Sequence, residues 1–412
     1  MQRTDTELRS LLLRAARIVL PDKVYEGASL SINEGRITNI YENAKDETAP
    51  ADAVLSLKGF TLFPGFIDVH IHGAMGVDTM EATADDLHRA GCFLAREGVT
   101  AWLPTFVPAP DEDYRRAVSA VDELIASQDQ QTKALAARAL GLHYEGPFVN
   151  TAQCGALRTA YFRTFKDAAD LDALPSLNGA SAAHMITVAP EVEGGIALVR
   201  ELRRRDWIVS IGHTRASVEV LNEACEAGAH HMTHFPNAML PLHHRAPGPV
   251  AWGLLRDDVT CDVIADGVHC DPLMLQLVLK CKGAARVTLI SDAVSPAGLG
   301  DGAYSVWSET ITVKEGRTSN ARGSIAGSVI MMRNAVRMML SLGVPANDVA
   351  RMASLNPARL LGVDRDYGSI ETGKRADLVA LDAQGRVRLT IIGGRIAFNA
   401  LHDSSATEEA KQ

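Results

Sequence analysis

The sequence predicts an α/β fold in which a (β/α)8 TIM-type barrel carries a small β-sandwich domain built from both chain ends. Short apolar runs alternate with helical patterns through the middle of the chain, which is typical of a parallel sheet. Both ends are instead rich in β-forming runs, and the 412 residues exceed the roughly 250 of a single barrel. We therefore expect the sandwich at residues 1–60 and 365–412 and the barrel at residues 61–364.

The β-rich ends each contain three short runs that are separated by turn residues such as those at 33–35 and 393–394. No helix of useful length fits between the N-terminal runs. We expect the two ends to form one sheet module, with a frayed tail over the last ten residues. The predicted strands are 17–20, 28–32, 36–40, 378–381, 387–392 and 395–398.

The middle of the chain, from about residue 60 to residue 361, contains eight apolar runs separated by helical patterns. The count of eight favours a closed barrel over an open sheet. The predicted strands are 62–67, 100–104, 139–143, 185–189, 208–211, 230–233, 261–264 and 287–291, and predicted helices include 84–97, 191–204, 217–227 and 272–280.

The composition is that of a globular protein. Apolar residues make up 47 % of the chain, and charged residues make up 22 %, close to the usual value of about 25 %. These values fit neither a disordered chain nor a membrane protein. The net charge of −9 and the absence of a basic stripe argue against a nucleic-acid partner.

Features tied to compartment are also informative. The six cysteines form no CxxC pair, which is typical of reduced, buried thiols in a chain of this length. The N-terminal segment has only a three-residue leucine run, whereas a secretory signal needs about 7–15 apolar residues. The sequence has no stretch of about 18 apolar residues, the length that a helix needs to span a bilayer. We expect a cytoplasmic protein without a membrane partner.

The end of the first barrel run carries a His70-Ile71-His72-Gly73 segment. Catalytic residues of barrel enzymes lie at the C-terminal ends of the strands. Two histidines separated by one residue in a strand point to the same face, and neutral imidazoles side by side form half of a zinc-type site. A lone pair of this kind is as often structural, but its place at a strand end favours metal binding.

Later runs place further histidines and carboxylates at strand ends. Alone, Glu145 would be interpreted as a surface acid. For Asp292, a helix cap or a salt-bridge acid is the less favoured alternative. His143 shares a strand face with Glu145 and is a candidate ligand or a support for one. His230 and His231 lie earlier in their strand and fit structural roles. The strand-end candidates after the first run are Glu145, His213, His234, His269 and Asp292.

Taken together, this array predicts a metal-dependent hydrolase that cleaves an amide. Zn²⁺ takes nitrogen and oxygen donors at about 2.0–2.2 Å from several directions, which a barrel mouth supplies. A metal ion lowers the pKa of bound water towards about 7. We expect Asp292 to accept the proton as the water attacks and to return it to the leaving group.

The motif order resembles that of the N-acetylglucosamine-6-phosphate deacetylase family of the amidohydrolase superfamily over nearly the whole chain. The motifs are PGFIDVHIHG, GLHYEGPFVN, GHTRAS, HMTHFPNAM, HHRAPG, ADGVHCDP, SDAVSPAG and GSIAGS, followed by the closing SLNPARLLG and GSIETGKRADLVALD segments. The HxH pair and the ADLV segment mark only the superfamily. The block around Glu145 and the NAM and HRAPG blocks are specific to the deacetylases.

The resemblance implies roles for individual residues and a divalent metal cofactor, with one or two ions per subunit. Glu145, His213 and His234 match ligands of the main ion, and His70 and His72 match ligands of a second ion that some members have lost. Asp292 matches the general acid and base. The positions that match substrate contacts are Ala156, Asn237, Ala238, Arg245, His269, Ile325, Ala326 and Gly327. In the family the arginine reaches the phosphate across a dimer interface, so a homodimer is implied.

The sequence departs from the family pattern at Leu157. The family usually has histidine or glutamine there, whose polar side chain helps to hold the scissile carbonyl. Leucine can neither donate a hydrogen bond nor polarise a carbonyl. Loss of one such donor costs about 2.7–4 kcal/mol in another enzyme. The second ion or Arg158 could replace it, or the substrate could differ. A smaller departure is Ala246, where an acid is common.

We therefore expect hydrolysis of the acetamide of an N-acetyl amino-sugar 6-phosphate, with N-acetylglucosamine-6-phosphate as the first candidate. Zn²⁺ is the first candidate ion, although Fe²⁺ and Mn²⁺ accept the same ligands. One alternative is a related amidohydrolase that deacylates or deaminates another substrate. Another is a homologue without metal that serves as a binding protein, which the intact ligand set argues against.

Overall fold

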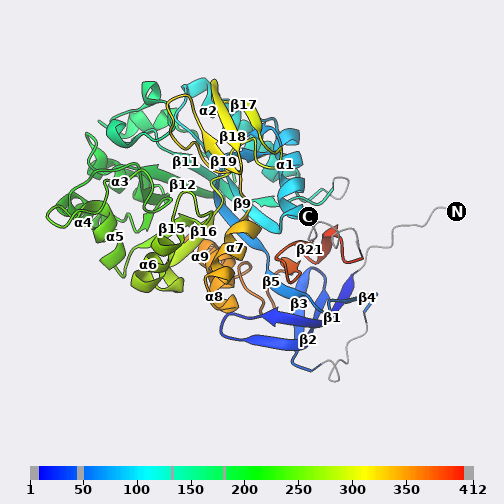
Figure 1. Cartoon of the computed structure of the whole chain (residues 1–412). Helices are drawn as coiled ribbons and strands as arrows, with labels where there is room; N and C mark the ends of the chain where they lie inside the picture. Colours follow the sequence, from blue (N-terminus) through cyan, green and yellow to red (C-terminus); the bar gives the residue numbers. More distant parts are fainter. Residues whose placement is uncertain (1–8, 44–50, 131–133, 180–181, 403–412) are drawn as a thin grey trace.

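The computed structural model describes residues 9–43, 51–130, 134–179 and 182–402, and its largest element is a barrel of eight parallel strands (Figure 1). The strands pair in chain order, as expected of a (β/α)8 barrel. They are β6 (Phe66–Ile71), β9 (Val99–Phe106), β11 (Gly141–Glu145), β12 (Ala183–Val188), β13 (Ile208–Ile211), β14 (His231–Met232), β15 (Thr260–Ile264) and β16 (Val287–Ile290). The predicted fold class is confirmed.

The barrel closes between its first and last strands through single hydrogen bonds rather than a regular ladder. The backbone N–H of Asp292 donates to the carbonyl oxygen of His70 at 2.9 Å. The carboxylate of Asp68 in β6 accepts from the backbone N–H of Ser291 at 3.2 Å and from its hydroxyl at 2.5 Å. These contacts bring the last strand end beside the HxH pair.

The first predicted barrel strand, 62–67, is divided in the structure. Its first half forms β5 (Thr61–Pro64), which pairs with β1 (Ser10–Val19) and β20 (Leu378–Leu381) in the sheet of the chain ends. The barrel strand β6 starts only after Gly65. A side chain at Gly65 would meet Thr100 at 2.2 Å, so glycine allows the chain to pass from one sheet to the other.

Helices cover the outside of the barrel and bury their apolar faces against it. In α1 (Ala84–Arg96), Thr83 and Asp86 form a capping box that satisfies the first backbone N–H groups. The other helices are α2 (Asp111–Ser127), α3 (Gly195–Arg204), α4 (Val218–Glu226), α5 (Gly248–Leu255), α6 (Pro272–Lys282), α7 (Met332–Ser341), α8 (Ala346–Ala350) and α9 (Asn356–Leu360). Short helices η2 (Thr151–Gln153), η3 (Thr159–Tyr161), η4 (Ala168–Ala173), η5 (Ala284–Arg286) and η6 (Arg351–Leu355) complete the connections.

The two chain ends share one mostly antiparallel sheet, as the β-rich ends predicted. Its order is β22-β21-β20-β5-β1-β2-β3, with β4 also paired to β1. Buried residues from both ends, including Leu13 and Leu389, form a core separate from that of the barrel. The remaining strands are β2 (Val24–Asn33), β3 (Arg36–Tyr41), β4 (Ala53–Ser56), β21 (Val387–Ile392) and β22 (Arg395–Asn399). The residue limits expected for the two domains stay a prediction.

Three short sheets or strands were not anticipated from the sequence. The largest is a three-stranded antiparallel sheet of β17 (Gly302–Val306), β18 (Glu309–Lys314) and β19 (Arg317–Ser319). Figure 1 places it at the opposite end of the view from the sheet of the chain ends. The others are the pair β7 (Gly73–Ala74) and β8 (Val77–Asp78), and β10 (Arg138–Ala139), which extends β11 backwards along β9.

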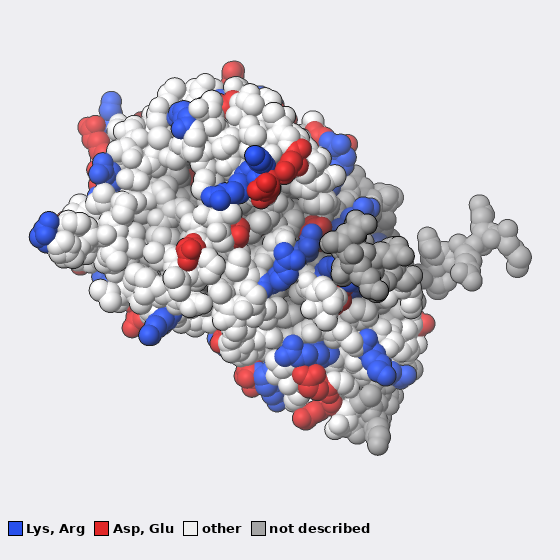
Figure 2. Space-filling model, viewed as in Figure 1, with Lys and Arg blue, Asp and Glu red and all other residues white. Residues whose placement is uncertain are grey.

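The helices of the described residues and the charges on one face of the molecule bear on the partners of this chain. Among the described residues, no helix is long and apolar enough to cross a membrane. On the face drawn in Figure 2, basic and acidic side chains are interspersed rather than gathered by sign. The expected frayed tail, residues 403–412, lies outside the described residues.

Candidate metal centre

The HxH pair lies at the C-terminal end of β6, with both rings buried. His70 and His72 are 0 % and 2 % exposed, and their Nε2 atoms are 3.2 Å apart. Gly73 has φ 151°, and a side chain there would meet the carbonyl oxygen of Val77 at 2.0 Å. Glycine is therefore required where the chain turns back immediately after the second histidine.

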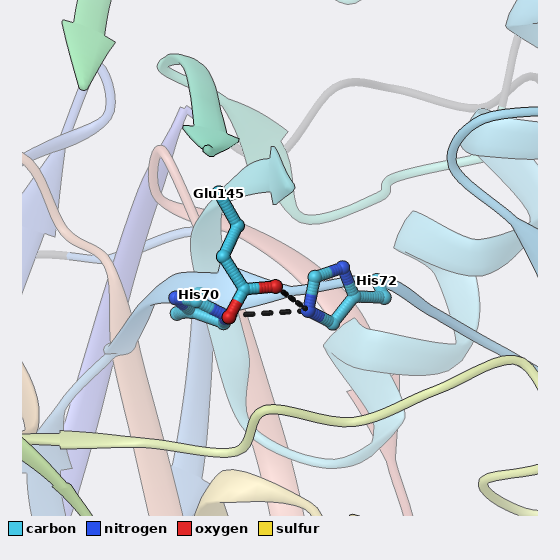
Figure 3. A group of neighbouring side chains, drawn as sticks. All are labelled: His70, His72 and Glu145. Atoms are coloured by element: carbon cyan, nitrogen blue, oxygen red, sulfur yellow. Dashed lines mark hydrogen bonds and ion pairs between the residues drawn. The ribbon is translucent and has the colours of Figure 1, made fainter. Parts of the chain in front are cut away.

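The carboxylate of Glu145, at the end of β11, lies between two pairs of histidines. Its Oε2 is 3.4 Å from Nε2 of His72, and its Oε1 is 3.8 Å from Nε2 of His70 (Figure 3). The same Oε1 is 2.8 Å from Nε2 of His213 and 3.0 Å from Nε2 of His234. One carboxylate thus contacts both candidate ligand sets, which share no other residue.

His213 and His234 follow β13 and β14, and their Nε2 atoms are 3.1 Å apart. Both residues have a left-handed backbone, with φ 48° and φ 33°. Asp292, which follows β16, has φ 50°. Non-glycine residues rarely adopt this conformation, which costs roughly 1–3 kcal/mol. Local backbone strain is thus concentrated at three of the strand-end positions that the sequence singled out.

Asp292 contacts the HxH pair rather than the other histidines. Its Oδ1 is 3.3 Å from Nε2 of His70 and 3.2 Å from Nε2 of His72. Its side chain is about 10 % exposed, compared with 5 % for Glu145. The carboxylate is therefore nearly as buried as the rest of the cluster.

The cluster combines buried carboxylates with buried imidazoles, and each perturbs the other. Burial alone would disfavour every charged form, yet the neighbouring histidines hold the pKa of Glu145 and that of Asp292 well below their usual range. Burial likewise opposes protonation of His72 and His234, but contacts with the carboxylates raise their pKa to about 10 and about 9. The site is therefore strongly attractive to positive charge.

The residues fit a divalent cation. Carbonyl oxygens only accept hydrogen bonds, so Nδ1 of His72 donates to Thr105 O at 3.2 Å and Nδ1 of His213 donates to Gln153 O at 2.7 Å. Metal binding requires deprotonated ring nitrogens, and in that form the Nε2 lone pairs point into the cluster, where the Nε2 atoms lie only 3.1–3.2 Å apart. A divalent cation among them would replace the protons that the carboxylates otherwise hold on these rings. Imidazole and carboxylate donors suit Zn²⁺ and related ions.

Several supporting residues were missed or left open by the sequence analysis. Asp262, fully buried in β15, accepts from the backbone N–H of His234 and contacts Nε2 of His231 at 3.0 Å. The structure thus gives His231 the structural setting that was expected. A carboxylate within an apolar strand was the signal that could have identified Asp262. His143 bonds to Val69 O and to the Thr187 hydroxyl, so it packs behind the cluster instead of joining it.

Two expected substrate segments lie directly against the cluster. An added side chain atom at Gly327 would lie 2.9 Å from the carbonyl oxygen of Asp292, and Ser328 N–H donates to that oxygen at 2.7 Å. This places the segment Ile325, Ala326 and Gly327 beside the candidate acid. Ala156 follows Gly155, where an added side chain atom would lie 3.6 Å from the ring of His213.

The other expected substrate residues are spread around the same strand ends. Asn237 donates to His234 O at 3.1 Å and contacts Cys270, which links it to the neighbouring His269. His269 pairs with Asp266 at 2.7 Å. Ala238 has φ 52° and accepts from Thr214 N–H. Arg245 is exposed in the loop before α5, where it contacts His243 and His244, so the structure does not bring it to the cluster of this subunit.

The departure at Leu157 is visible in the structure. Leu157 is 3 % exposed and packs in the barrel's core cluster. Arg158 lies over the ring of Tyr161 at 4.8 Å and donates to Pro108 O at 3.5 Å. These contacts direct the guanidinium to Pro108 and Tyr161, and its role as a replacement for a carbonyl-polarising side chain stays a prediction. The HxH pair, the other replacement considered for the missing side chain, forms part of the cluster.

Comparisons with known proteins agree with this geometry. The model of the Amidohydrolase family matches residues 61–397. The chain is 35 % identical to the N-acetylglucosamine-6-phosphate deacetylase of Bacillus subtilis over 94 % of this chain and 97 % of that protein. It is 36 % identical to the N-acetylgalactosamine-6-phosphate deacetylase of Escherichia coli O157:H7, with coverage of 94 % and 99 %.

Solved structures of deacetylases resemble this chain over nearly its whole length. The N-acetylglucosamine-6-phosphate deacetylase of Thermotoga maritima superimposes with a TM-score of 0.83 at 33 % identity, covering 94 % of this chain and 99 % of that one. A variant of the Mycobacterium smegmatis enzyme, in complex with N-acetyl-D-glucosamine-6-phosphate, gives a TM-score of 0.85 at 30 % identity, with coverage of 95 % and 100 %.

Proposed function

Because this chain belongs to the N-acetylglucosamine-6-phosphate deacetylases of the amidohydrolase family, we propose that it hydrolyses the acetamide of an N-acetyl amino-sugar 6-phosphate. The products are acetate and the amino-sugar phosphate, and N-acetylglucosamine-6-phosphate is the first candidate substrate. The observation that carries the proposal is the convergence of four imidazoles and Asp292 on the carboxylate of Glu145 at the barrel mouth.

The cofactor is a divalent metal ion, with Zn²⁺ as the first candidate. Glu145, His213 and His234 would hold one ion, and His70 and His72 with the second oxygen of Glu145 would hold another. When bound, such ions supply Lewis-acid chemistry, which acidifies water and polarises an amide carbonyl. This contribution is most needed here because Leu157 cannot polarise the carbonyl.

Asp292 carries the proton transfers. A carboxylate is ionised at neutral pH, so Asp292 can accept the proton of the attacking water. It then donates that proton to the amide nitrogen as the C–N bond breaks. The backbone at Ile325, Ala326 and Gly327, which lies against Asp292, would hold the sugar so that its acetamide faces this carboxylate.

The phosphate is bound across a homodimer. Arg245 lies in an exposed loop, and its guanidinium contacts the neighbouring His244 of the same loop. A second subunit would use this arginine to complete the site, and Asn237, Ala238 and His269 would contact the sugar. A charged sugar phosphate does not cross membranes freely, and all six cysteines are free thiols, so we place the enzyme in the cytoplasm.

A second candidate substrate is N-acetylgalactosamine-6-phosphate, because the relative named for it is as similar to this chain as the glucosamine enzyme is. The test is to measure acetate release from both sugars, each with and without the 6-phosphate, for the unmodified enzyme and for Arg245→Ala. We expect phosphorylated substrates to be preferred, and Arg245→Ala to raise KM for these alone. Equal turnover of neutral and phosphorylated sugars would contradict the proposed substrate class.

A further inference from the structure

The sheet of β17, β18 and β19 packs one face against the barrel core and leaves the other face open to solvent. Val306, Ile311 and Val313 are buried, whereas Ala303, Ser305 and Thr310 are exposed. The two residues that join β17 to β18 are Trp307 and Ser308, and Trp307 is only 9 % exposed. The turn thus buries the Trp307 indole, the largest side chain of the hairpin.

The backbone of this turn is strained in a way that requires support. Trp307 has φ 51° and Ser308 has φ 63°, the pattern of a two-residue type I′ turn. Such turns strongly favour Asn-Gly or Asp-Gly, because residues with bulky side chains are disfavoured at positive φ. Conformations of this kind persist only where surrounding contacts determine them, and they gather at functional sites.

The indole ring contacts His72, one of the two HxH residues. The ring centroids are 5.2 Å apart at an angle of 82°, an edge-to-face arrangement. On another side, Nδ1 of His72 donates to Thr105 O. The imidazole is therefore held both by a hydrogen bond and by an aromatic wall, and its Nε2 is left to face Glu145 and Asp292.

A second observation ties Trp307 to the same corner of the site. Nε1 of Trp307 and Oδ2 of Asp78 are both buried and have no hydrogen-bond partner, one being a donor and the other an acceptor. Burial raises the pKa of the Asp78 carboxyl to about 6, and both His72 and the Trp307 indole oppose this rise. Asp78 lies on β8, the short strand paired to Gly73 directly after the HxH pair.

We propose that Trp307 is a positioning residue for the ion held by His70 and His72, which it serves by fixing the His72 ring and closing that side of the barrel mouth. The ring keeps water from replacing Nε2 of His72 as a ligand of the ion, and the indole N–H faces the carboxylate of Asp78. The Trp307 ring contacts His72, whereas the rings of His213 and His234 pack on each other, so the ion at those residues should not depend on Trp307. The inference rests on the two-ion site of the proposed function.

The test measures binding of Zn²⁺ itself, in competition with a chelator of known affinity, and counts bound ions by mass spectrometry. We expect two ions per chain for the unmodified protein. Trp307→Ala should weaken the second ion by about 10–100-fold, as loss of a residue that orients a ligand typically does. The first ion should change by less than about threefold. Trp307→Phe keeps an apolar ring without the N–H, so we expect a smaller loss at the second ion only.

The matched control is Tyr304→Phe, which removes a hydrogen bond to Gly300 O on the same hairpin but does not touch His72. Both ions should bind this variant as they bind the unmodified protein. The inference is overturned if Trp307→Ala leaves both affinities unchanged, if it weakens both equally, or if the unmodified chain binds one ion only. Because metal binding is measured without a sugar, failure of deacetylation would contradict the proposed function and leave this result separate.

Discussion

Glu145 is the residue that the two candidate ion sites share. Its Oε1 lies within 3.0 Å of two Nε2 atoms, and its Oε2 faces the HxH pair. A buried carboxylate with this many imidazole neighbours is costly unless positive charge is present. The same geometry places Asp292 beside the HxH pair, where we propose that it exchanges a proton with the substrate.

At this scale the first prediction concerns Asp292→Asn. The variant keeps the shape of the side chain but cannot accept a proton, so kcat should fall by about 10²–10⁴-fold in an acetate-release assay. The metal content at Glu145, His213 and His234 should be retained, because Asp292 does not contact those histidines in the structure. Asp271→Asn, on the exposed cap of α6, is the control and should keep normal turnover. Ordinary turnover of Asp292→Asn would refute the assigned role.

The strand-end residues could be predicted from sequence because two simple rules apply to them. Side chains two apart in a strand share a face, and the C-terminal ends of barrel strands meet at one mouth. The supports could not be predicted in this way. Asp262 acts on His234, which lies 28 residues away, and Trp307 contacts His72 from a hairpin far along the chain. Such contacts depend on neighbours that only the folded structure brings together.

At the scale of elements, the sequence predicted the type of most segments better than their limits. The break at Gly65 was missed because an apolar run continues through it, whereas the structure assigns its halves to different sheets. The β17–β18 hairpin was missed because Trp307 and Ser308 lack the composition of a two-residue turn. In both cases tertiary contacts decide what local preference does not.

A prediction at this scale concerns Lys282, a buried lysine at the end of α6. Its ammonium donates to the carbonyl oxygens of Gly253, Arg256 and Val259 at 2.5–2.8 Å, which joins α6 to the end of α5 and to the segment before β15. Lys282→Met should leave these acceptors unpaired and lower the free energy of unfolding by about 1–3 kcal/mol. The measurement is urea denaturation.

The matched control is Lys280→Met, which changes an exposed lysine on the same helix and should alter stability by less than about 0.5 kcal/mol. A result in which both substitutions have the same effect would show that the three carbonyl contacts of Lys282 contribute nothing specific to stability.

At the scale of the whole molecule, the chain unites a barrel and a sheet that is assembled from both ends. β5 pairs with strands from both halves of that sheet and runs directly into β6, so the sheet is continuous in sequence with the strand that carries the HxH pair. Arg245, which we propose completes the site of a partner subunit, lies in an exposed loop.

The proposed homodimer gives a prediction for the whole particle. Sedimentation equilibrium should give a mass twice the 44.2 kDa of one chain. If the enzyme is dimeric for the reason proposed, mixing Arg245→Ala with Asp292→Asn subunits should restore part of the activity, since mixed dimers contain one site with both residues intact. A fully active monomer would contradict the shared site.

The central claim is that a divalent ion acts with Asp292 to cleave a sugar-phosphate acetamide. The most direct measurement is release of acetate and free amine from N-acetylglucosamine-6-phosphate before chelation, after chelation, and after Zn²⁺ is restored. We expect equal amounts of the two products, loss of turnover on chelation with the fold retained, and recovery with the ion. A folded protein that carries the ion and releases no acetate from either the glucosamine or the galactosamine substrate would contradict the account.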